Sequence, residues 1–271
     1  MRVRLAAHEA FRPEAARVAR ALARYDVAVD IVGPDVDAEL ALRPVQGPQR
    51  PSDTPWCAVL ALPEPRDALV TLEGRSATLD EVPEDGTVGL SGRLRREMLA
   101  VHRPDLRVMQ VENGTAVPQL LKRGRIDGWI ASVREIRAAG LTDSTGEVFE
   151  PTSWATRAGS GALVLDCART PDDVRARLTG LDAPAARASL DAELAVLEAL
   201  DADQDAPVGV LARPHGELLR VRALVPAAEG RRLVRAEISG SLSAPAEAGR
   251  RTADLLLERG AAELLGSRNA R

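Results

Sequence analysis

At the start of the chain, apolar residues form short runs typical of buried strands and line one face of a predicted helix, a pattern typical of an α/β domain. Residues 3–7 form an apolar run that predicts a buried strand. Residues 12–25 place their apolar side chains on one helical face and carry Pro13 in the first turn, which predicts a helix. A second strand is predicted over residues 27–32. A strand, a helix and a strand in this order imply a right-handed crossover and a parallel pair.

The pattern is interrupted after this first unit. Four prolines between positions 33 and 54 interrupt any long element, so this segment is predicted to cross the surface as a loop. Residues 56–62 then form an apolar run that predicts a buried strand, and another strand is predicted to start at residues 68–71.

A second alternation of strands and helices follows. Strands are predicted over residues 87–90, 107–110 and 128–132, helices over residues 93–101, 116–123 and 133–139, and a further buried strand over residues 162–166. Such alternation is typical of a doubly wound sheet.

The C-terminal part of the chain has a different pattern. It begins with a long amphipathic helix predicted over residues 185–200. Three antiparallel strands are predicted over residues 208–212, 217–223 and 232–239, with a hairpin turn at 214–216, followed by helices over 244–259 and 261–265. This pattern predicts a small α+β domain.

Composition narrows the class of protein. The 271 residues, 45% hydrophobic and 28% charged, suit a globular chain of two or three domains. A net charge of -4 argues against nucleic acid as an obligatory partner, because phosphate binding needs a strongly basic face. No apolar signal segment or long apolar span is found, so we expect a cytoplasmic protein without a membrane partner. The preference for arginine and alanine points to a bacterial, GC-rich genome.

The two cysteines lie in apolar, strand-like runs. Cys57 and Cys167 are therefore expected to be buried free thiols rather than a disulfide or metal ligands. Together with three scattered histidines they form no zinc pattern, and no metal site is predicted.

Four stretches carry a resemblance to a known family. They are Pro-Arg-Asp-Ala-Leu-Val at 65–70, Val-Gly-Leu-Ser-Gly-Arg-Leu-Arg-Arg at 88–96, Arg-Pro-Asp-Leu at 103–106, and residues 113–127. In content, order and spacing they resemble porphobilinogen deaminase, also called hydroxymethylbilane synthase. The resemblance extends over nearly the whole chain.

This resemblance implies a fold and its domain limits. The fold class is α/β, with two periplasmic-binding-protein-like α/β domains around a cleft and a small C-terminal α+β domain. The expected limits are 1–75 with 155–190 for the first domain, 76–154 for the second and 191–271 for the third.

The family joins four porphobilinogens on a dipyrromethane cofactor that is held by a cysteine, and uses one aspartate for catalysis. Gln204 stands at the cysteine position, and an amide cannot form the anchoring thioether, so we expect no dipyrromethane and no other cofactor. Gly47 stands at the aspartate position and cannot move protons or stabilise positive charge. A short run at 34–37 replaces a longer family segment that includes a cleft-covering loop.

Several residues remain as candidates for binding a small anionic or pyrrole-like molecule. They are Ser91, Arg93, Arg95, Arg96 and Asn113. Arginine forks suit carboxylates, and a helix that begins at residue 93 would add its positive dipole end. The alternative interpretation is a solvated helix face.

His8 and Glu9 are the candidates for acid-base chemistry. They follow the first predicted strand, and ligands of open α/β sheets bind at the carboxyl ends of strands. The alternative is a polar loop without a role in catalysis.

Three functional hypotheses follow. The first is a repurposed cleft, in a divergent transferase or lyase of specialised metabolism or in a non-catalytic binder. The second is an inactive paralogue, a pseudoenzyme that serves as protein partner or regulator of a tetrapyrrole enzyme. The third is a true hydroxymethylbilane synthase with a non-covalent primer. Whether the protein is an enzyme stays open at this point.

Overall fold

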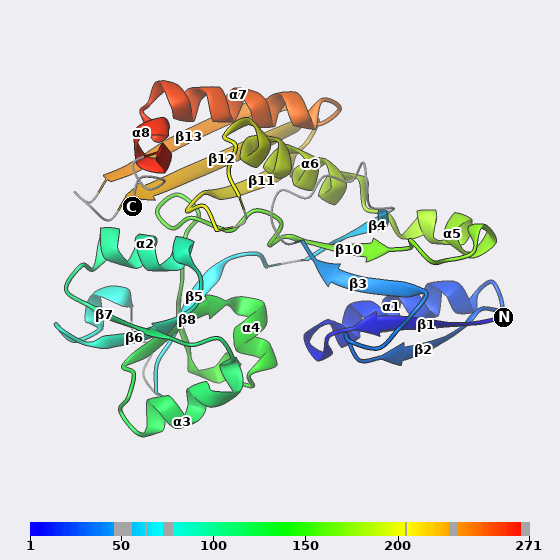
Figure 1. Cartoon of the computed structure of the whole chain (residues 1–271), viewed down its shortest axis with the longest axis horizontal. Helices are drawn as coiled ribbons and strands as arrows, with labels where there is room; N and C mark the ends of the chain where they lie inside the picture. The colour runs from blue at the N-terminus through cyan, green and yellow to red at the C-terminus, as the bar shows by residue number, and fades with distance from the viewer. Residues whose placement is uncertain (46–55, 63, 73–77, 204, 228–231, 267–271) are drawn as a thin grey trace.

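The computed structural model contains three β-sheets with helices packed against them (Figure 1). It describes residues 1–45, 56–62, 64–72, 78–203, 205–227 and 232–266. Two sheets have five strands and the third has three. The expected fold class, two α/β units with an additional α+β unit, is confirmed.

The first sheet has the strand order β2-β1-β3-β10-β4. Its strands are β1 (Arg2–Ala7), β2 (Ala28–Val32), β3 (Leu40–Pro44), β4 (Trp56–Ala61) and β10 (Ala162–Asp166), and its helices are α1 (Arg12–Ala23) and α5 (Asp172–Leu178). β1 and β2 are parallel, as predicted from the strand, helix and strand order. Helix α1 buries Ala15, Val18 and Leu22 against this sheet, since these residues share one helical face.

β3 lies within the segment that the prolines predicted to be a loop, so that prediction was wrong for residues 40–44. The strand pairs in parallel with β1 and antiparallel with β10, and it buries Leu40 and Leu42 in the first core. Pro44 is the last residue of β3, where a missing N–H does least harm to the ladder.

The second sheet has the strand order β7-β6-β8-β5-β9. Its strands are β5 (Asp67–Val70), β6 (Thr87–Leu90), β7 (Arg107–Gln110), β8 (Gly128–Ser132) and β9 (Thr145–Val148), and its helices are α2 (Arg93–His102), α3 (Val117–Lys122) and α4 (Val133–Ala138). The three strands expected from the alternating pattern are parallel, while β5 and β9 run antiparallel to their neighbours.

The third sheet is an antiparallel meander with three helices packed against it. It consists of β11 (Gly209–His215), β12 (Leu218–Ala227) and β13 (Arg232–Ser241), with α6 (Pro184–Ala199), α7 (Pro245–Glu258) and α8 (Ala261–Gly266). α6 and α7 approach closely at Gly249, where a Cβ atom would lie 2.3 Å from the Ala192 carbonyl oxygen. Only glycine fits at this contact.

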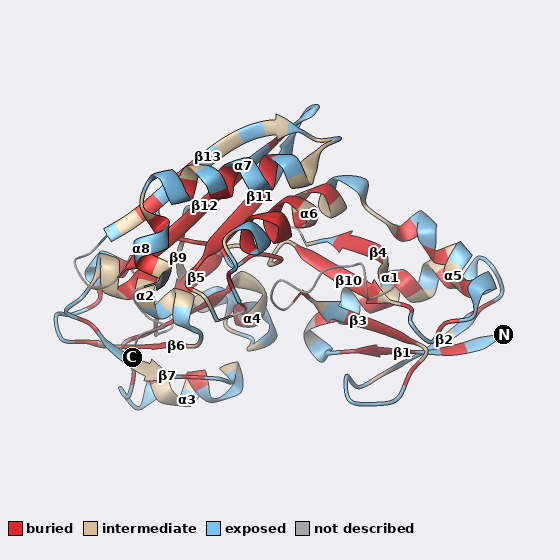
Figure 2. Cartoon of the chain, turned by 45° about the horizontal axis from the view of Figure 1, so that its top comes forward, coloured by how far each residue is buried: buried red, intermediate tan, exposed pale blue. Residues whose placement is uncertain are grey.

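The sheets differ from the expected domain limits at two places. β5 belongs to the second sheet, so the chain leaves the first sheet between residues 61 and 67 rather than at residue 75. Helix α6 joins the third core from Ala192 onward, and through Leu190 and Leu194 it joins a separate cluster with Val59 and Val164 of the first sheet. Figure 2 shows α6 largely buried between these two parts of the molecule. The expected limits otherwise stay a prediction.

No helix in the described part of the chain combines the length and the apolar character needed to cross a bilayer.

Cys57 and Cys167 form a disulfide, so the expectation of two free thiols was wrong. β4 and β10 are antiparallel neighbours in the first sheet, and this pairing brings the two Cα atoms to 6.0 Å. The residues are 110 positions apart in the chain, so no local pattern reveals that they are neighbours.

Breaking this disulfide is expected to lower the free energy of unfolding by about 2–5 kcal/mol, because the bridge closes a long loop in the unfolded chain. The measurement is denaturant unfolding with and without reductant, for the natural chain and for the Cys57→Ser, Cys167→Ser double variant. Only the natural chain should respond to reductant. Alkylation of both thiols in unreduced, denatured protein would contradict the bridge.

Candidate functional site

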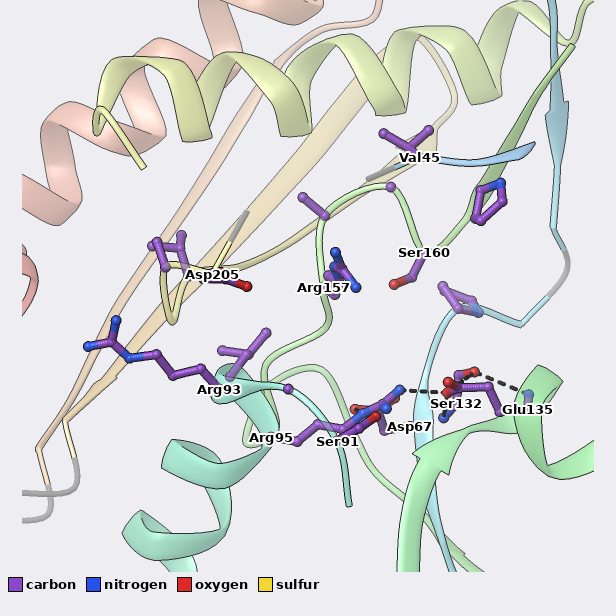
Figure 3. Close-up of a pocket in the computed structure, with 18 of the residues that line it drawn as sticks. Val45, Asp67, Ser91, Arg93, Arg95, Ser132, Glu135, Arg157, Ser160 and Asp205 are labelled. Atoms are coloured by element: carbon purple, nitrogen blue, oxygen red, sulfur yellow. Dashed lines mark hydrogen bonds and ion pairs between the residues drawn. The ribbon is translucent and has the colours of Figure 1, made fainter. Parts of the chain in front are cut away.

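A pocket of about 380 Å³ lies where the three sheets meet (Figure 3). Its lining comes from the end of β3 (44–45), the segment around the start of β5 (64, 65 and 67), the start of α2 (91–95), the start of α4 (132, 134 and 135), the crossover that returns to the first sheet (157–160), residues 203, 205, 206 and 208 before β11, and the single residues Glu112 and Leu197. Segments far apart in the sequence thus share one cavity, as in other sites between domains.

Helix α2 begins at this pocket. Its N-cap is Gly92, with a φ of 84° and no side chain to accept the free N–H groups of the first turn. The first turn also carries no acidic residue. The N–H groups and the positive dipole end are therefore available to an anion, with the neighbouring Ser91 and Arg93 in the lining.

Arg95 lines the pocket, but two carboxylates hold its guanidinium. Its Nε and Nη2 donate to both oxygens of Asp67 at 3.0 and 2.8 Å, and Nη2 also donates to Glu135 Oε2 at 2.8 Å. The side chains of Arg95 and Asp67 are 17% and 9% exposed. Burial alone would lower the pKa of Arg95, but Asp67 and Glu135 outweigh it and raise that pKa above its ordinary value.

Glu135 connects this ion pair to the start of α4. Its Oε2 accepts from the backbone N–H and hydroxyl of Ser132 at 2.8 and 2.7 Å, and Ser132 in turn caps the helix by accepting from the Glu135 N–H. Burial would raise the pKa of Glu135, but Arg95 and the Ser132 hydrogen bonds lower it to about 2. The site therefore holds a permanent ionic cluster of one arginine and two carboxylates.

Three of the five predicted binding residues, Ser91, Arg93 and Arg95, line the pocket. Arg96 and Asn113 are not among its lining residues, and their role in binding stays a prediction. Arg96 donates to Gln110 Oε1 at 2.9 Å on the outer side of α2, since adjacent helical residues point in different directions. Asn113 accepts from the Thr115 N–H at 2.9 Å and so caps a short helical turn.

The acid-base candidates also lie outside the pocket lining. His8 and Glu9 follow β1 as predicted, but both are exposed, and the His8 ring lies edge-on to Phe11 with 6.3 Å between centroids. Gly47 and Gln204 lie outside the described residues. The neighbours of position 204, Asp203 and Asp205, are in the lining.

The structure adds two arginines to the pocket that the sequence did not single out. Arg134 is in the first turn of α4, and Arg157 is on the crossover. Arginine is common in this chain, and neither residue belongs to a recognisable motif. Only the tertiary structure reveals their common location.

A buried carboxyl group supports the crossover. Glu193 of α6 is 3% exposed, and its two oxygens accept the N–H groups of Gly159 at 2.7 Å and Ala212 at 2.9 Å. Burial raises the pKa of Glu193 to about 7, although these hydrogen bonds and Arg213 act in the opposite direction.

Comparison with known proteins identifies the family. A family model described as "Porphobilinogen deaminase, dipyromethane cofactor binding domain" matches residues 47–176. Porphobilinogen deaminase of Stenotrophomonas maltophilia is 31% identical over 233 residues, which are 84% of this chain and 76% of that protein. The chain belongs to the porphobilinogen deaminase family. The porphobilinogen deaminase of Acidothermus cellulolyticus is 33% identical over 226 residues, 79% of this chain and 66% of that protein.

Solved structures with a similar arrangement are distant in sequence. A pheromone precursor lipoprotein of Enterococcus faecalis has a TM-score of 0.48 at 12% identity and covers 67% of this chain and 91% of its own. An ancestral arginine-binding protein bound to arginine has a TM-score of 0.43 at 12% identity, covering 66% and 90%.

The expectation that the chain has no cofactor was wrong. The matching family model is that of the domain that binds dipyrromethane, so membership in the porphobilinogen deaminase family points to this cofactor. Dipyrromethane carries carboxylate side chains and pyrrole N–H groups. The arginines of the pocket and the start of α2 can bind the carboxylates, and Asp205 can accept from the pyrrole N–H groups. The residues present therefore fit dipyrromethane.

Removing Arg95 is expected to destabilise the protein far more than removing Arg93. Arg95→Ala leaves Asp67 buried without its counter-ion, which costs about 3 kcal/mol or more. Arg93→Ala breaks only a partly exposed pair with Glu97 at 4.0 Å, worth less than about 1 kcal/mol. Denaturant unfolding of both variants measures the difference, and equal losses would refute a structural role for Arg95.

Glu193 is expected to make stability depend on pH. Because its folded pKa of about 7 lies above the ordinary value of 4.5, its contribution is complete below pH 4.5 and is lost as the pH rises through 7. Glu193→Gln should flatten this part of the profile. It should also lower stability by about 1–3 kcal/mol, since an amide nitrogen cannot accept a backbone N–H.

Thermal unfolding from pH 4 to 8 measures this effect. Glu258→Gln, on the exposed side of α7, is the matched control and should keep the profile of the natural chain. A profile unchanged by Glu193→Gln would assign the pH dependence to other groups.

Proposed function

We propose that the pocket binds a small anionic, pyrrole-like ligand and that ordinary hydroxymethylbilane synthesis is not the reaction of this protein. Ligand binding is supported by the start of α2, which has no side-chain cap and lies at the pocket together with Ser91 and Arg93. The chain is also a member of the porphobilinogen deaminase family. Uncapped N–H groups, a hydroxyl and a guanidinium all favour a carboxylate.

The proposal that ordinary hydroxymethylbilane synthesis is not the reaction rests on two positions in the sequence. Gln204 has no thiolate with which to form a thioether, and Gly47 has no carboxylate with which to move a proton. Dipyrromethane, the group to which the family model points, is then a ligand held by hydrogen bonds and ion pairs rather than by a covalent bond. Such a pocket suits a non-catalytic binder or a divergent enzyme of specialised metabolism.

A second candidate is a true hydroxymethylbilane synthase that works from a non-covalent primer. The family-model match to the dipyrromethane-binding domain favours it. Bound dipyrromethane would supply the primer to which further pyrroles are joined. Here the chain's own residues would bind the carboxylates at Ser91 and Arg93 and orient the pyrrole N–H groups toward Asp205.

Incubation of the purified chain with porphobilinogen distinguishes these candidates. We expect a complex in native mass spectrometry that is absent from the denatured mass, and no porphyrin in a uroporphyrin assay. Arg93→Glu should weaken binding at least about tenfold, since it reverses a charge at the anion site. Arg125→Glu, an exposed residue of the same domain outside the lining, should not.

Each other outcome overturns part of the proposal. Porphyrin without a covalent adduct would establish the second candidate. An adduct that survives denaturation would show covalent family chemistry despite Gln204 and Gly47. Failure of the natural chain to bind porphobilinogen would reject a pyrrole-binding pocket and leave a role as protein partner or regulator.

A further inference from the structure

The arginines that line the pocket fall into two groups by their ion pairs. Arg93 faces Glu97 at 4.0 Å, and Arg95 binds Asp67 and Glu135 at 2.8 Å. For Arg134 and Arg157, no carboxylate in the described part of the chain lies within ion-pair distance. Within the described residues, both guanidinium groups therefore line the pocket without an ion-pair partner.

Arg134 is in an unfavourable environment for a lone cation. Burial lowers its pKa and so do the nearby charges of Arg95 and Arg157, while Glu135 and Glu14 act in the opposite direction. Glu135, its neighbour in sequence, is bound to Arg95 and Ser132 instead. The partial compensation is a cation-π contact, in which the guanidinium carbon lies 4.7 Å from the centroid of the Phe11 ring in the first domain.

Arg157 extends from a firmly held backbone. The residue forms a β-bridge with Gly209, and the carbonyl oxygen of Thr156 accepts the Val210 N–H at 2.7 Å. Two residues further, Gly159 is held by Glu193. The exposed side chain of Arg157 is thus presented from a fixed segment, and Figure 3 shows it in the pocket beside Ser160. Little entropy of the backbone remains to be lost when a ligand binds.

We propose that Arg134 and Arg157 together form a carboxylate-binding subsite of the pocket, separate from the start of α2. This proposal rests on the proposed function and specifies it. A ligand that uses both places carries at least two carboxylates, one at Ser91 and Arg93 and another between Arg134 and Arg157. Binding at this subsite places an anion beside two like charges that have no ion-pair partner among the described residues, and so gains affinity from both.

Titration calorimetry with porphobilinogen, a pyrrole that carries two carboxylates, tests the subsite. Arg157→Gln and Arg134→Gln should each raise Kd at least about tenfold, as expected for loss of a charged hydrogen bond. The double variant should raise Kd by less than the product of the two single effects, because both residues hold one carboxylate. Arg125→Gln is the matched control and should bind like the natural chain.

Two comparisons separate an effect on ligand binding from an effect on folding. Arg134→Lys retains the charge but loses the planar fork, and it should bind more tightly than Arg134→Gln and more weakly than the natural chain. Arg157 is exposed, so Arg157→Gln should fold normally even where a change at Arg134 disturbs the contact with Phe11. Thermal unfolding of each variant checks this.

The outcomes separate this inference from the proposed function. Equal affinity of the natural chain, Arg157→Gln and Arg134→Gln would overturn the subsite and leave the proposed function intact. Absence of porphobilinogen binding to the natural chain would overturn both. Additive losses in the double variant would mean that the arginines hold different groups, which contradicts a shared subsite.

Discussion

Glu193 accepts the N–H groups of Gly159 and Ala212 from within α6, where the crossover passes the third sheet. Buried backbone N–H groups need partners, and at this point helix and sheet ladders supply none. Gly159 has a φ of 78° and lies so close to Val45 that a Cβ atom would be 2.6 Å from its Cβ. One carboxyl group therefore links α6, β11 and the turn beside β3. The positions of Arg157 and Ser160 in the pocket depend on that link.

The charges of the pocket form a second, related system. Glu135 raises the pKa of Arg134 but forms no ion pair with it; its Oε2 accepts instead from Arg95 and from Ser132 at the start of α4. The helix cap and the buried ion pair thus share the carboxylate that is nearest to Arg134 in the sequence. Asp67 completes it from β5, and its location in the second sheet is what brings the segment before β5 to the pocket. A guanidinium group that has no ion-pair partner among the described residues, near a fixed ionic cluster, favours an anionic ligand over a cationic one.

Most elements could be predicted from the sequence because their signals are local. The parallel pair of β1 and β2, the meander of β11 to β13 and the helix α6 all follow from periodicity and turn residues. What failed depends on contacts between distant segments. β3 is a short strand beside prolines, and its pairing with β1 and β10 outweighs local preference. The Cys57–Cys167 bridge and the presence of Arg134 and Arg157 in the pocket lining likewise depend on contacts between segments that are distant in the sequence.

In the proposed function, the binding of a pyrrole and its covalent anchoring depend on different residues. The proposed carboxylate-binding groups, at the start of α2, the start of α4 and the crossover, lie within residues 47–176, which match the dipyrromethane-binding model, whereas Asp205, proposed for the pyrrole N–H groups, does not. Gln204, at the position of the family's cysteine, lies outside that range. The segments proposed to bind the ligand are held in place by burial and by the hydrogen bonds of Glu193. Whether a thioether can form depends instead on one side chain, that of residue 204. Under the proposed function, the pocket would therefore keep a preference for carboxylated pyrroles while the covalent chemistry changes.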